Sequence, residues 1–555
     1  MNSPESTAAK EPTGGDVLVD VMRRHGIDTA FGVISIHNLP LVEAVARELN
    51  FVEMRHEAAV VNAADGYARA SGKIGVAITS TGTGAGNAAG SMVEALTAGS
   101  RVLHITGQID SPYLGAGRGV IHEFPKQLQM LESFSKHAAT IGDAKDVEAE
   151  LETAIAHILA APSGPASIEW PSDLQYLARP EDQRPYDLPA LAVPMPSDPE
   201  VLEAARMIMA AERPLIWAGG GAAGAGPELA DLVHRLGAGL ITSNSGRAVV
   251  AEDDDLVIGN FGATPEVGAL LAESDLLIAI GSHFRSNETK GYKLRLPDRI
   301  VAIDVDPAAI GRVYPATVGL TGDAAAVLSA LLQAVESPAT LPHWPSRVTS
   351  VRETVRAQLT DYIGAYADIC AGLRTVLPRD AVVARDVTIP SSQWGNRLLP
   401  FYERQTNIFP LGGGIGQGLA MGIGAAQARP DTPTVVIAGD GGLAVHLGEL
   451  SSLAGTGAPV VVLVFNDGGY GVLRNMQEAN GFDRAGVDLH TPRFDLLATS
   501  MGMPYALIRD ASTFEKELAE AVALRGPALI EIDVTSLEPA PGPFTPPVHV
   551  PTREG

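Results

Sequence analysis

The stretch that decides the fold runs from Val435 to Gln477 and reads VVIAGDGGLAVHLGELSSLAGTGAPVVVLVFNDGGYGVLRNMQ. A short apolar run breaks at a glycine-rich turn, leucines at helical spacing follow, and a second apolar run ends at Asn466. This order is typical of a βαβ unit with buried parallel strands. If the two strands are neighbours, the polar loops that follow them lie beside each other at the carboxyl edge of the sheet.

These two loops carry oxygen ligands. Asp440 follows the first strand, Asn466 ends the second, and the Gly468–Gly469 turn frees backbone carbonyls. Such hard donors suit Mg²⁺ or Ca²⁺ rather than zinc. Gly441 and Gly442 leave bare N–H groups at a helix start, which favours an anion. The GDGG motif alone could be a simple tight turn, but its pairing with Asn466 indicates a metal ion beside a phosphorylated ligand, most simply a diphosphate.

This combination resembles the cofactor motif of the thiamine-diphosphate enzymes, where GDG precedes an Asn that follows a second apolar run. The resemblance implies that Asp440, Asn466 and the carbonyl of Gly468 hold Mg²⁺, which bridges the diphosphate. The same resemblance implies further cofactor-binding positions, namely Gly439, Gly441, Gly442, Tyr470 and Gly471.

A second motif, Arg55-His56-Glu57, follows an apolar run and precedes a helix of small residues. A lone glutamate at a helix start could simply be stabilised by the helix dipole. The string resembles the N-terminal domain of the same family, in which a glutamate contacts the aminopyrimidine ring of the cofactor. The resemblance implies that Glu57 stabilises the imino tautomer that deprotonates the thiazolium carbon.

The glycine-rich segment from Pro410 to Gly418 resembles the loop of the family that bends the cofactor. By this resemblance Ile415 is the apolar wedge between the two rings, and the carbonyl of Gly413 accepts from the amino group. Thr388 is expected to donate to the diphosphate. The alternative for Ile415 is ordinary core packing.

Repeated strands, glycine turns and helices predict an α/β protein with three doubly wound parallel-sheet domains. We expect a pyrimidine-binding domain over 15–180, a central Rossmann-like domain over 195–336, and a diphosphate- and magnesium-binding domain over 350–538. Proline-rich linkers separate them. Residues 1–14 are expected to be disordered, and 539–555 form a proline-rich tail.

The segment Gly219–Gly224 offers a function of a different class, because G-x-G-x-x-G after a strand is typical of nicotinamide or flavin dehydrogenases. That function needs an acidic residue after the next strand, which ends instead in Ser243-Asn244-Ser245. We therefore interpret the glycines as a structural turn. The resemblance makes this the domain that binds FAD in acetolactate synthases, but His283–Asn287 replace their acidic segment, which argues against FAD.

Composition excludes some function classes. The chain of 555 residues carries 40 basic and 65 acidic residues, a net charge of −25, which argues against a nucleic-acid surface. Cys370 is the only cysteine, so no intrachain disulfide can form. The N-terminus lacks the apolar core of a signal peptide, and no apolar run has membrane-spanning length. We expect a soluble cytoplasmic protein.

The resemblance implies that a cofactor carbanion attacks a 2-oxo acid, CO₂ leaves, and the enamine is protonated or attacks a second carbonyl. We expect a 2-oxo acid decarboxylase or carboligase, similar to acetolactate synthase and benzoylformate decarboxylase. A 2-hydroxyacyl-CoA or benzaldehyde lyase-type carboligase is the alternative. A cofactor-binding protein without chemistry is disfavoured because Glu57 is present.

Three histidines, His37, His122 and His283, lie on loops expected to face the cofactor, and we expect at least one to act as acid or base. Ile36 occupies the place of a serine in the benzoylformate decarboxylases. Val472 and Met476 share one helical face if a helix starts at Gly471. The resemblance places them against the side group of the substrate, where acetolactate synthases commonly have Met and Trp, and it therefore implies room for a group larger than methyl. In the family the site lies between two subunits, so we expect a homodimer at minimum and a homotetramer by resemblance.

Overall fold

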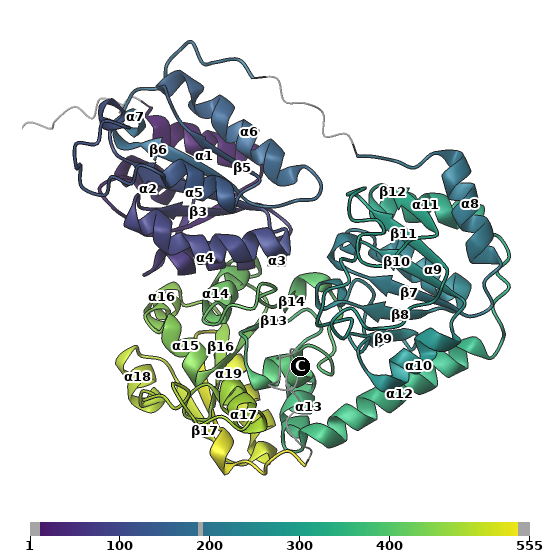
Figure 1. The fold of residues 1–555 in the computed structure, drawn as a ribbon. Coiled ribbons are helices and arrows are strands. Elements are labelled where there is room, and N and C mark those ends of the chain that lie inside the picture. Colours follow the sequence, from purple (N-terminus) through teal and green to yellow (C-terminus); the bar gives the residue numbers. More distant parts are fainter. Residues whose placement is uncertain (1–11, 187–192, 542–555) are drawn as a thin grey trace, which may run out of the picture. The chain divides into compact units, whose positions relative to one another are not determined.

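The computed structural model describes residues 12–186 and 193–541, and within them the chain forms three six-stranded parallel sheets. Helices flank each sheet, as Figure 1 shows. The predicted α/β class with three parallel sheets is therefore confirmed. The predicted domain boundaries themselves stay a prediction.

The first sheet has the strand order β2-β1-β3-β4-β6-β5. Strands β3 and β4 are buried along their whole length, as expected for parallel strands covered on both faces. The strands are β1 (Thr29–Gly32), β2 (Asn50–Glu53), β3 (Gly75–Thr79), β4 (Val102–Gln108), β5 (His137–Thr140) and β6 (Ala166–Pro171). The helices are α1 (Gly14–Arg24), α2 (Leu39–Glu48), α3 (Glu57–Ser71), α4 (Thr83–Ala98), α5 (Gln127–Ser133), α6 (Val147–Leu159) and α7 (Ser172–Gln175).

The N-terminus is ordered earlier than expected. Helix α1 begins at Gly14, and Thr13 pairs with Ala178 in an isolated β-bridge. The side chain of Asp16 accepts from the backbone N–H of Thr13 at 2.6 Å, so the two residues cap the helix. The expectation of disorder is wrong for residues 12–14, because Thr13 and Asp16 cap α1 and Thr13 pairs with Ala178; residues 1–11 lie outside the described residues.

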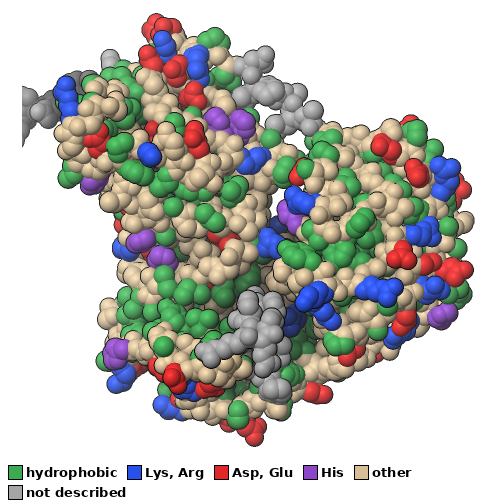
Figure 2. Space-filling view, viewed as in Figure 1, with side chains coloured by type: hydrophobic (Ala, Val, Ile, Leu, Met, Phe, Trp, Pro, Cys, Tyr) green, Lys and Arg blue, Asp and Glu red, His purple; other side chains and the backbone are tan. Residues whose placement is uncertain are grey.

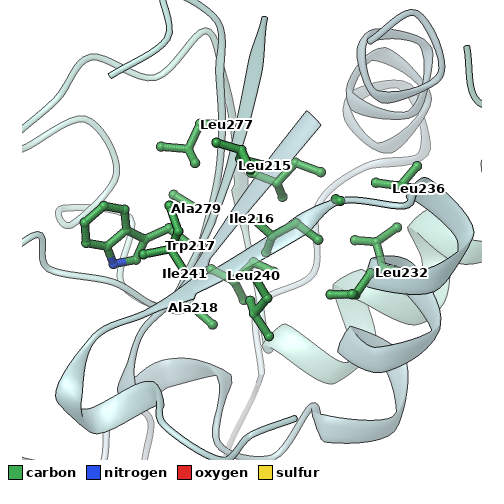
Figure 3. Close-up of a cluster of buried hydrophobic side chains, with 14 of the residues drawn as sticks. Leu215, Ile216, Trp217, Ala218, Leu232, Leu236, Leu240, Ile241, Leu277 and Ala279 are labelled. Carbon is green, nitrogen blue, oxygen red and sulfur yellow. The ribbon is translucent and has the colours of Figure 1, made fainter. Parts of the chain in front are cut away.

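The central sheet has the order β12-β11-β10-β7-β8-β9. Figure 3 shows Leu215, Ile216 and Trp217 of β7 packed with residues of β8, β10 and α9. The strands are β7 (Pro214–Ala218), β8 (Gly239–Thr242), β9 (Val257–Gly259), β10 (Leu276–Ile280), β11 (Ile300–Asp304) and β12 (Val318–Thr321). The helices are α8 (Asp198–Met209), α9 (Gly226–Leu236), α10 (Pro265–Glu273) and α11 (Ala324–Ala334).

The glycines of the G-x-G-x-x-G segment pack against a neighbouring turn. A Cβ at Gly219 would lie 2.2 Å from the carbonyl oxygen of Gly281, and one at Gly221 would lie 2.7 Å from its Cα. Glycine is needed at both positions for this close backbone approach. This contact accounts for the two glycines without a dinucleotide and supports the interpretation as a structural turn.

The third sheet has the order β14-β13-β15-β16-β18-β17. Its strands are β13 (Val382–Arg385), β14 (Asn407–Ile408), β15 (Thr434–Gly439), β16 (Val460–Asn466), β17 (Tyr505–Ile508) and β18 (Ala528–Asp533). The helices after the central sheet are α12 (Trp344–Ile363), α13 (Tyr366–Val376), α14 (Gly418–Ala428), α15 (Asp440–Val445), α16 (Glu449–Thr456), α17 (Gly471–Ala479), α18 (Phe494–Ser500) and α19 (Phe514–Ala523). Of the expected tail over 539–555, residues 542–555 lie outside the described residues.

The βαβ unit predicted from the opening stretch is present. Strands β15 and β16 are parallel neighbours, with Gly439 opposite Phe465. The helical segment between them differs from the expectation, since α15 ends at Val445 and α16 begins only at Glu449. Gly448 lies in the break, where glycine weakens a helix, and the carboxylate of Glu449 is engaged with the turn before α3.

The chain forms two compact units. The N-terminal unit contains the first sheet with its helices and also residues 410–430 and 446–458, hence α14 and α16; the C-terminal unit contains the other two sheets. Within the N-terminal unit α14 crosses α3 closely, because a Cβ at Gly424 would lie 1.8 Å from the carbonyl oxygen of Ala63. A Cβ at Gly66 would likewise lie 2.1 Å from that of Met421.

The face in Figure 2 carries acidic and basic side chains together. Among the residues that the structure describes, no helix combines the length and the apolar content that crossing a bilayer demands.

Candidate functional site

Asp440 is the first residue of α15 and follows β15 directly. It is 1% exposed, and neither carboxylate oxygen has a hydrogen-bond partner within the described chain. Burial, and next the neighbouring Asp467 carboxylate, raise the pKa of Asp440 to about 6. A buried carboxylate without a partner is unfavourable, so this pocket of negative charge favours a cation.

Asn466 lies at the end of β16, the strand beside β15. Its side-chain nitrogen donates to Oε1 of Glu531 at 2.7 Å, and its Oδ1 accepts from the backbone N–H of Gly468 at 3.2 Å. Gly468 and Gly469 have φ angles of +81° and +147°, which only glycine adopts easily. Glu531 thus orients the side-chain amide of Asn466, and the amide oxygen of Asn466 faces the Gly468 turn.

The donor set of this loop pair fits a hard divalent ion. Across the described ranges, no group of three or more His, Cys, Asp or Glu side chains has a metal-binding arrangement. The predicted ligands are instead one carboxylate, one amide oxygen and one backbone carbonyl, which would not form such a group. Oxygen donors of this kind suit Mg²⁺, but the assignment of Asp440, Asn466 and Gly468 as ligands stays a prediction.

The predicted diphosphate-binding positions line the same sheet edge. A Cβ at Gly439 would lie 3.0 Å from Oγ1 of Thr388, and one at Gly441 would lie 2.8 Å from the ring of Tyr470. A side chain at Gly439 would crowd Thr388, and one at Gly441 would meet Tyr470. The structure therefore gathers most of the predicted cofactor residues at one edge of the third sheet: Thr388, Gly439, Gly441, Gly442, Tyr470 and Gly471.

Helix α17 begins at Gly471, as expected, so Val472 and Met476 lie one turn apart. Both side chains are half-buried. Their contact with a substrate stays a prediction.

Glu57 is the first residue of α3, in the N-terminal unit. The side-chain nitrogen of Asn87 donates to its Oε2 at 3.0 Å. A Cβ at Gly84 would lie 2.8 Å from its Oε1, so the carboxylate rests against the first turns of α4. Its contact with a cofactor ring stays a prediction.

Two buried glutamates that the sequence did not reveal hold the loops around these residues. Oε1 of Glu449 accepts from the backbone N–H groups of Arg55 at 3.0 Å and His56 at 2.9 Å, directly before Glu57. Glu94 accepts from the backbone N–H groups of Leu411 at 2.7 Å and Gly412 at 2.6 Å. Burial raises the pKa of Glu449. Sequence offers no signal for either pairing, since the partners lie hundreds of positions apart.

Glu94 thereby anchors the loop that resembles the cofactor-bending segment. Arg69 donates to Glu94 at 2.9 Å and to Asp65 at 2.6 Å, which completes a buried ionic network under the loop. Gly413 has a φ angle of +81°, and Ile415 is 38% exposed. Ile415 is thus not a core residue of the described chain, which suits the predicted wedge.

The structure brings together two of the three predicted histidines. The ring centroids of His37 and His122 lie 5.2 Å apart. His37 is 7% exposed, and burial, followed by His122, lowers its pKa, whereas Asp110 opposes the shift. Ile36, predicted to line the substrate pocket, is 61% exposed on the same loop as His37.

His283 belongs to the C-terminal unit. It is exposed on the loop after β10, where it lines a small pocket of the central sheet together with Asp304 and Tyr314. Burial raises the pKa of Asp304, and His283 opposes that shift. A role of His283 as acid or base stays a prediction.

Comparison with known proteins covers most of the chain. Three family models of thiamine pyrophosphate enzymes match: the N-terminal TPP-binding domain over residues 12–130, the central domain over 201–331 and the C-terminal TPP-binding domain over 390–532. A probable 2-ketoarginine decarboxylase of Pseudomonas aeruginosa is 30% identical over 528 residues, 94% of each chain. The acetolactate synthase large subunit of Parasynechococcus marenigrum is 30% identical, with 96% of this chain and 89% of the relative covered.

These matches agree with the two cofactor motifs on the first and third sheets and with the three parallel sheets themselves. The chain belongs to the thiamine-pyrophosphate-dependent enzymes.

Proposed function

We propose that this enzyme uses thiamine diphosphate and Mg²⁺ to cleave or form a carbon–carbon bond next to a carbonyl. The reaction that the site supports best is decarboxylation of a 2-oxo acid, with the product released as an aldehyde or joined to a second carbonyl compound. The observation that carries the proposal is the buried, unpartnered carboxylate of Asp440 beside Asn466 at the ends of two neighbouring strands.

The cofactor, when bound, supplies the nucleophilic carbon and the electron sink that decarboxylation requires. Asp440, Asn466 and the carbonyl of Gly468 would hold the metal ion, which neutralises the buried charge. The bare N–H groups of Gly441 and Gly442 at the start of α15 would bind the diphosphate. Glu57 would hold a ring nitrogen of the cofactor by a hydrogen bond.

His37 and His122 are the residues that we propose for proton transfer to or from the reacting substrate. Their rings are adjacent, and each has one buried nitrogen without a hydrogen-bond partner, Nε2 and Nδ1 respectively, within the described chain. Imidazole is suited to this work because it titrates near neutral pH. One relative is named as a probable decarboxylase and another as an acetolactate synthase, so the comparisons support both release of the product as an aldehyde and its joining to a second carbonyl compound.

We further infer a homodimer at minimum, and a homotetramer by resemblance to the family. The predicted site residues are divided between the two compact units, and in the family such residues come from different subunits. The alternative dehydrogenase function has no observation in its favour, because the contact with Gly281 accounts for Gly219 and Gly221.

Calorimetric titration of the apo-protein with thiamine diphosphate tests the proposal. We expect binding that requires Mg²⁺, is lost in EDTA, and is lost in Asp440→Ala. Asp533→Ala, at the end of β18 in the same sheet, is the matched control and should bind like wild type. If EDTA-treated protein and Asp440→Ala bind the cofactor as tightly as wild type, the motif has been misinterpreted.

A further inference from the structure

The backbone of His37 is held in place by its surroundings. The side-chain nitrogen of Gln175 donates to the carbonyl oxygen of His37 at 2.8 Å. A Cβ at Gly107 would lie 2.4 Å from that same oxygen, so the backbone of β4 packs directly against the residue. These contacts fix the backbone of His37. In the neutral ring one nitrogen donates and the other accepts, so the role of His37 depends on which nitrogen carries the proton.

Ser172, the first residue of α7, contacts Nδ1 of the His37 ring. Its Oγ lies 3.3 Å from Nδ1 of His37, 2.9 Å from Oδ1 of Asp110 and 3.0 Å from the carbonyl oxygen of Gln108. A hydroxyl group has a single proton to donate. The atoms that face it, Oδ1 of Asp110 and the backbone carbonyl oxygen of Gln108, can only accept, and the carboxylate is the stronger acceptor of the two. The hydroxyl therefore donates to oxygen, and Nδ1 must be the donor in its contact with Oγ.

We propose that Ser172 and Asp110 are positioning residues that hold neutral His37 with its proton on Nδ1, so that Nε2 is the atom that takes up or returns a proton during the reaction. This rests on the proposed function of the site. The second observation that supports it is the buried Nε2, which has no hydrogen-bond partner among the described residues, since a buried ring nitrogen without a partner is unfavourable unless it serves a ligand.

The charges around the ring oppose each other. His122 disfavours a positive charge on His37, whereas Asp110, linked through Ser172, favours it. Without the hydroxyl of Ser172, the link from Asp110 to the ring is broken and the neutral ring is free to carry its proton on Nε2.

The test compares Ser172→Ala with Ser167→Ala in the full-length enzyme. Ser167 on β6 is the matched control, because its hydroxyl contacts Nδ1 of His104 at 3.2 Å in the same unit. Burial lowers the pKa of His104 to about 4, and this ring lies outside the proposed site. Nitrogen NMR of [¹⁵N]histidine-labelled protein reports the tautomer directly, with the His37→Gln spectrum used for assignment.

We expect wild type and Ser167→Ala to show the Nδ1–H tautomer of His37, and Ser172→Ala to shift toward Nε2–H. Turnover of a 2-oxo acid should fall about tenfold in Ser172→Ala with little change in KM, a part of the roughly 100-fold that acid–base catalysis contributes. Asp110→Asn, a change at an exposed side chain, should move the acid limb of the pH–rate profile to lower pH and keep the fold.

A wild-type Nε2–H tautomer, or an unchanged tautomer and rate in Ser172→Ala, would overturn the assignment. If wild type turns over no 2-oxo acid but Ser172→Ala still shifts the tautomer, the proposed function fails while the positioning role stands.

Discussion

Asp440→Asn separates the stability of the apo-protein from its function. The change keeps the size of the side chain and removes a charge that is buried and without a hydrogen-bond partner in the described chain. Because burial and Asp467 raise its pKa from 3.8 to about 6, the folded apo-protein disfavours the ionised form of Asp440. We expect the variant to be more stable than wild type without metal, although it no longer binds the cofactor.

The magnitude follows from the shift in pKa. The folded protein binds the Asp440 proton more tightly than the unfolded chain, so the free energy of unfolding falls as the pH rises from about 4 to about 6. Above that range the full cost is present, about 3 kcal/mol for a shift of this size. The asparagine variant escapes this cost, so its advantage should be about 3 kcal/mol at pH 8 and roughly half of that at pH 5.

Urea denaturation of metal-free wild type and variant at both pH values measures this difference. Tryptophan fluorescence follows unfolding, because all four tryptophans are fully buried: Trp170, Trp217, Trp344 and Trp394. Of these, Trp394 contacts the third sheet, with its ring centroid 6.3 Å from that of Phe465 on β16. Mg²⁺ with thiamine diphosphate should stabilise wild type and leave the variant unchanged.

Asp533→Asn is the control for the pH dependence. Burial raises the pKa of Asp533, but the hydroxyls of Thr535 and Ser536 hydrogen-bond its carboxylate and hold the pKa below its usual value. The stabilisation from Asp533 is therefore present throughout pH 5 to 8 and is lost only at lower pH, so the effect of this variant should not change across that range. An Asp440→Asn variant that is destabilised, or whose effect is the same at pH 5 and pH 8, would refute the reasoning.

Four further outcomes are expected. Glu57→Gln should retain the cofactor and lose at least ~100-fold in turnover; near-wild-type activity contradicts the assignment. Purified protein should show no flavin absorbance, because His283–Asn287 replace the acidic segment, and a stoichiometric flavin spectrum would overturn this. Met476→Trp should penalise a bulky 2-oxo acid relative to pyruvate by about 1–3 kcal/mol in kcat/KM; an unchanged ratio places the pocket elsewhere. Gly424→Ala should lower the free energy of unfolding by about 1–3 kcal/mol through overpacking, whereas Gly268→Ala in α10, with open space around it, should not destabilise.

The fold could be predicted largely because buried parallel strands are continuous apolar runs that end at glycine turns. The strands β15 and β16 are parallel neighbours, as the motif required. The break between α15 and α16 could not be predicted, because α16 belongs to the N-terminal unit and its Glu449 binds a turn almost 400 positions earlier.

The residues of the candidate site could likewise be predicted only in part. Motif residues such as Glu57 and Asp440 could be singled out because their neighbours in sequence carry the signal. Glu94 and Glu449 could not, since they act on backbone N–H groups of distant loops and stand in unremarkable helical contexts. The pairing of His37 with His122 was equally hidden, because His122 comes from the long loop between β4 and α5.

The central claim is that this chain decarboxylates a 2-oxo acid with thiamine diphosphate and Mg²⁺. The direct measurement is CO₂ release from a panel of 2-oxo acids, from pyruvate to branched and aromatic ones, with and without an added aldehyde. The account predicts release that needs both the cofactor and Mg²⁺, is abolished in Asp440→Ala, and is at least ~100-fold slower in Glu57→Gln. Release that persists in EDTA-treated protein or in Asp440→Ala, or no release from any member of the panel, would contradict it.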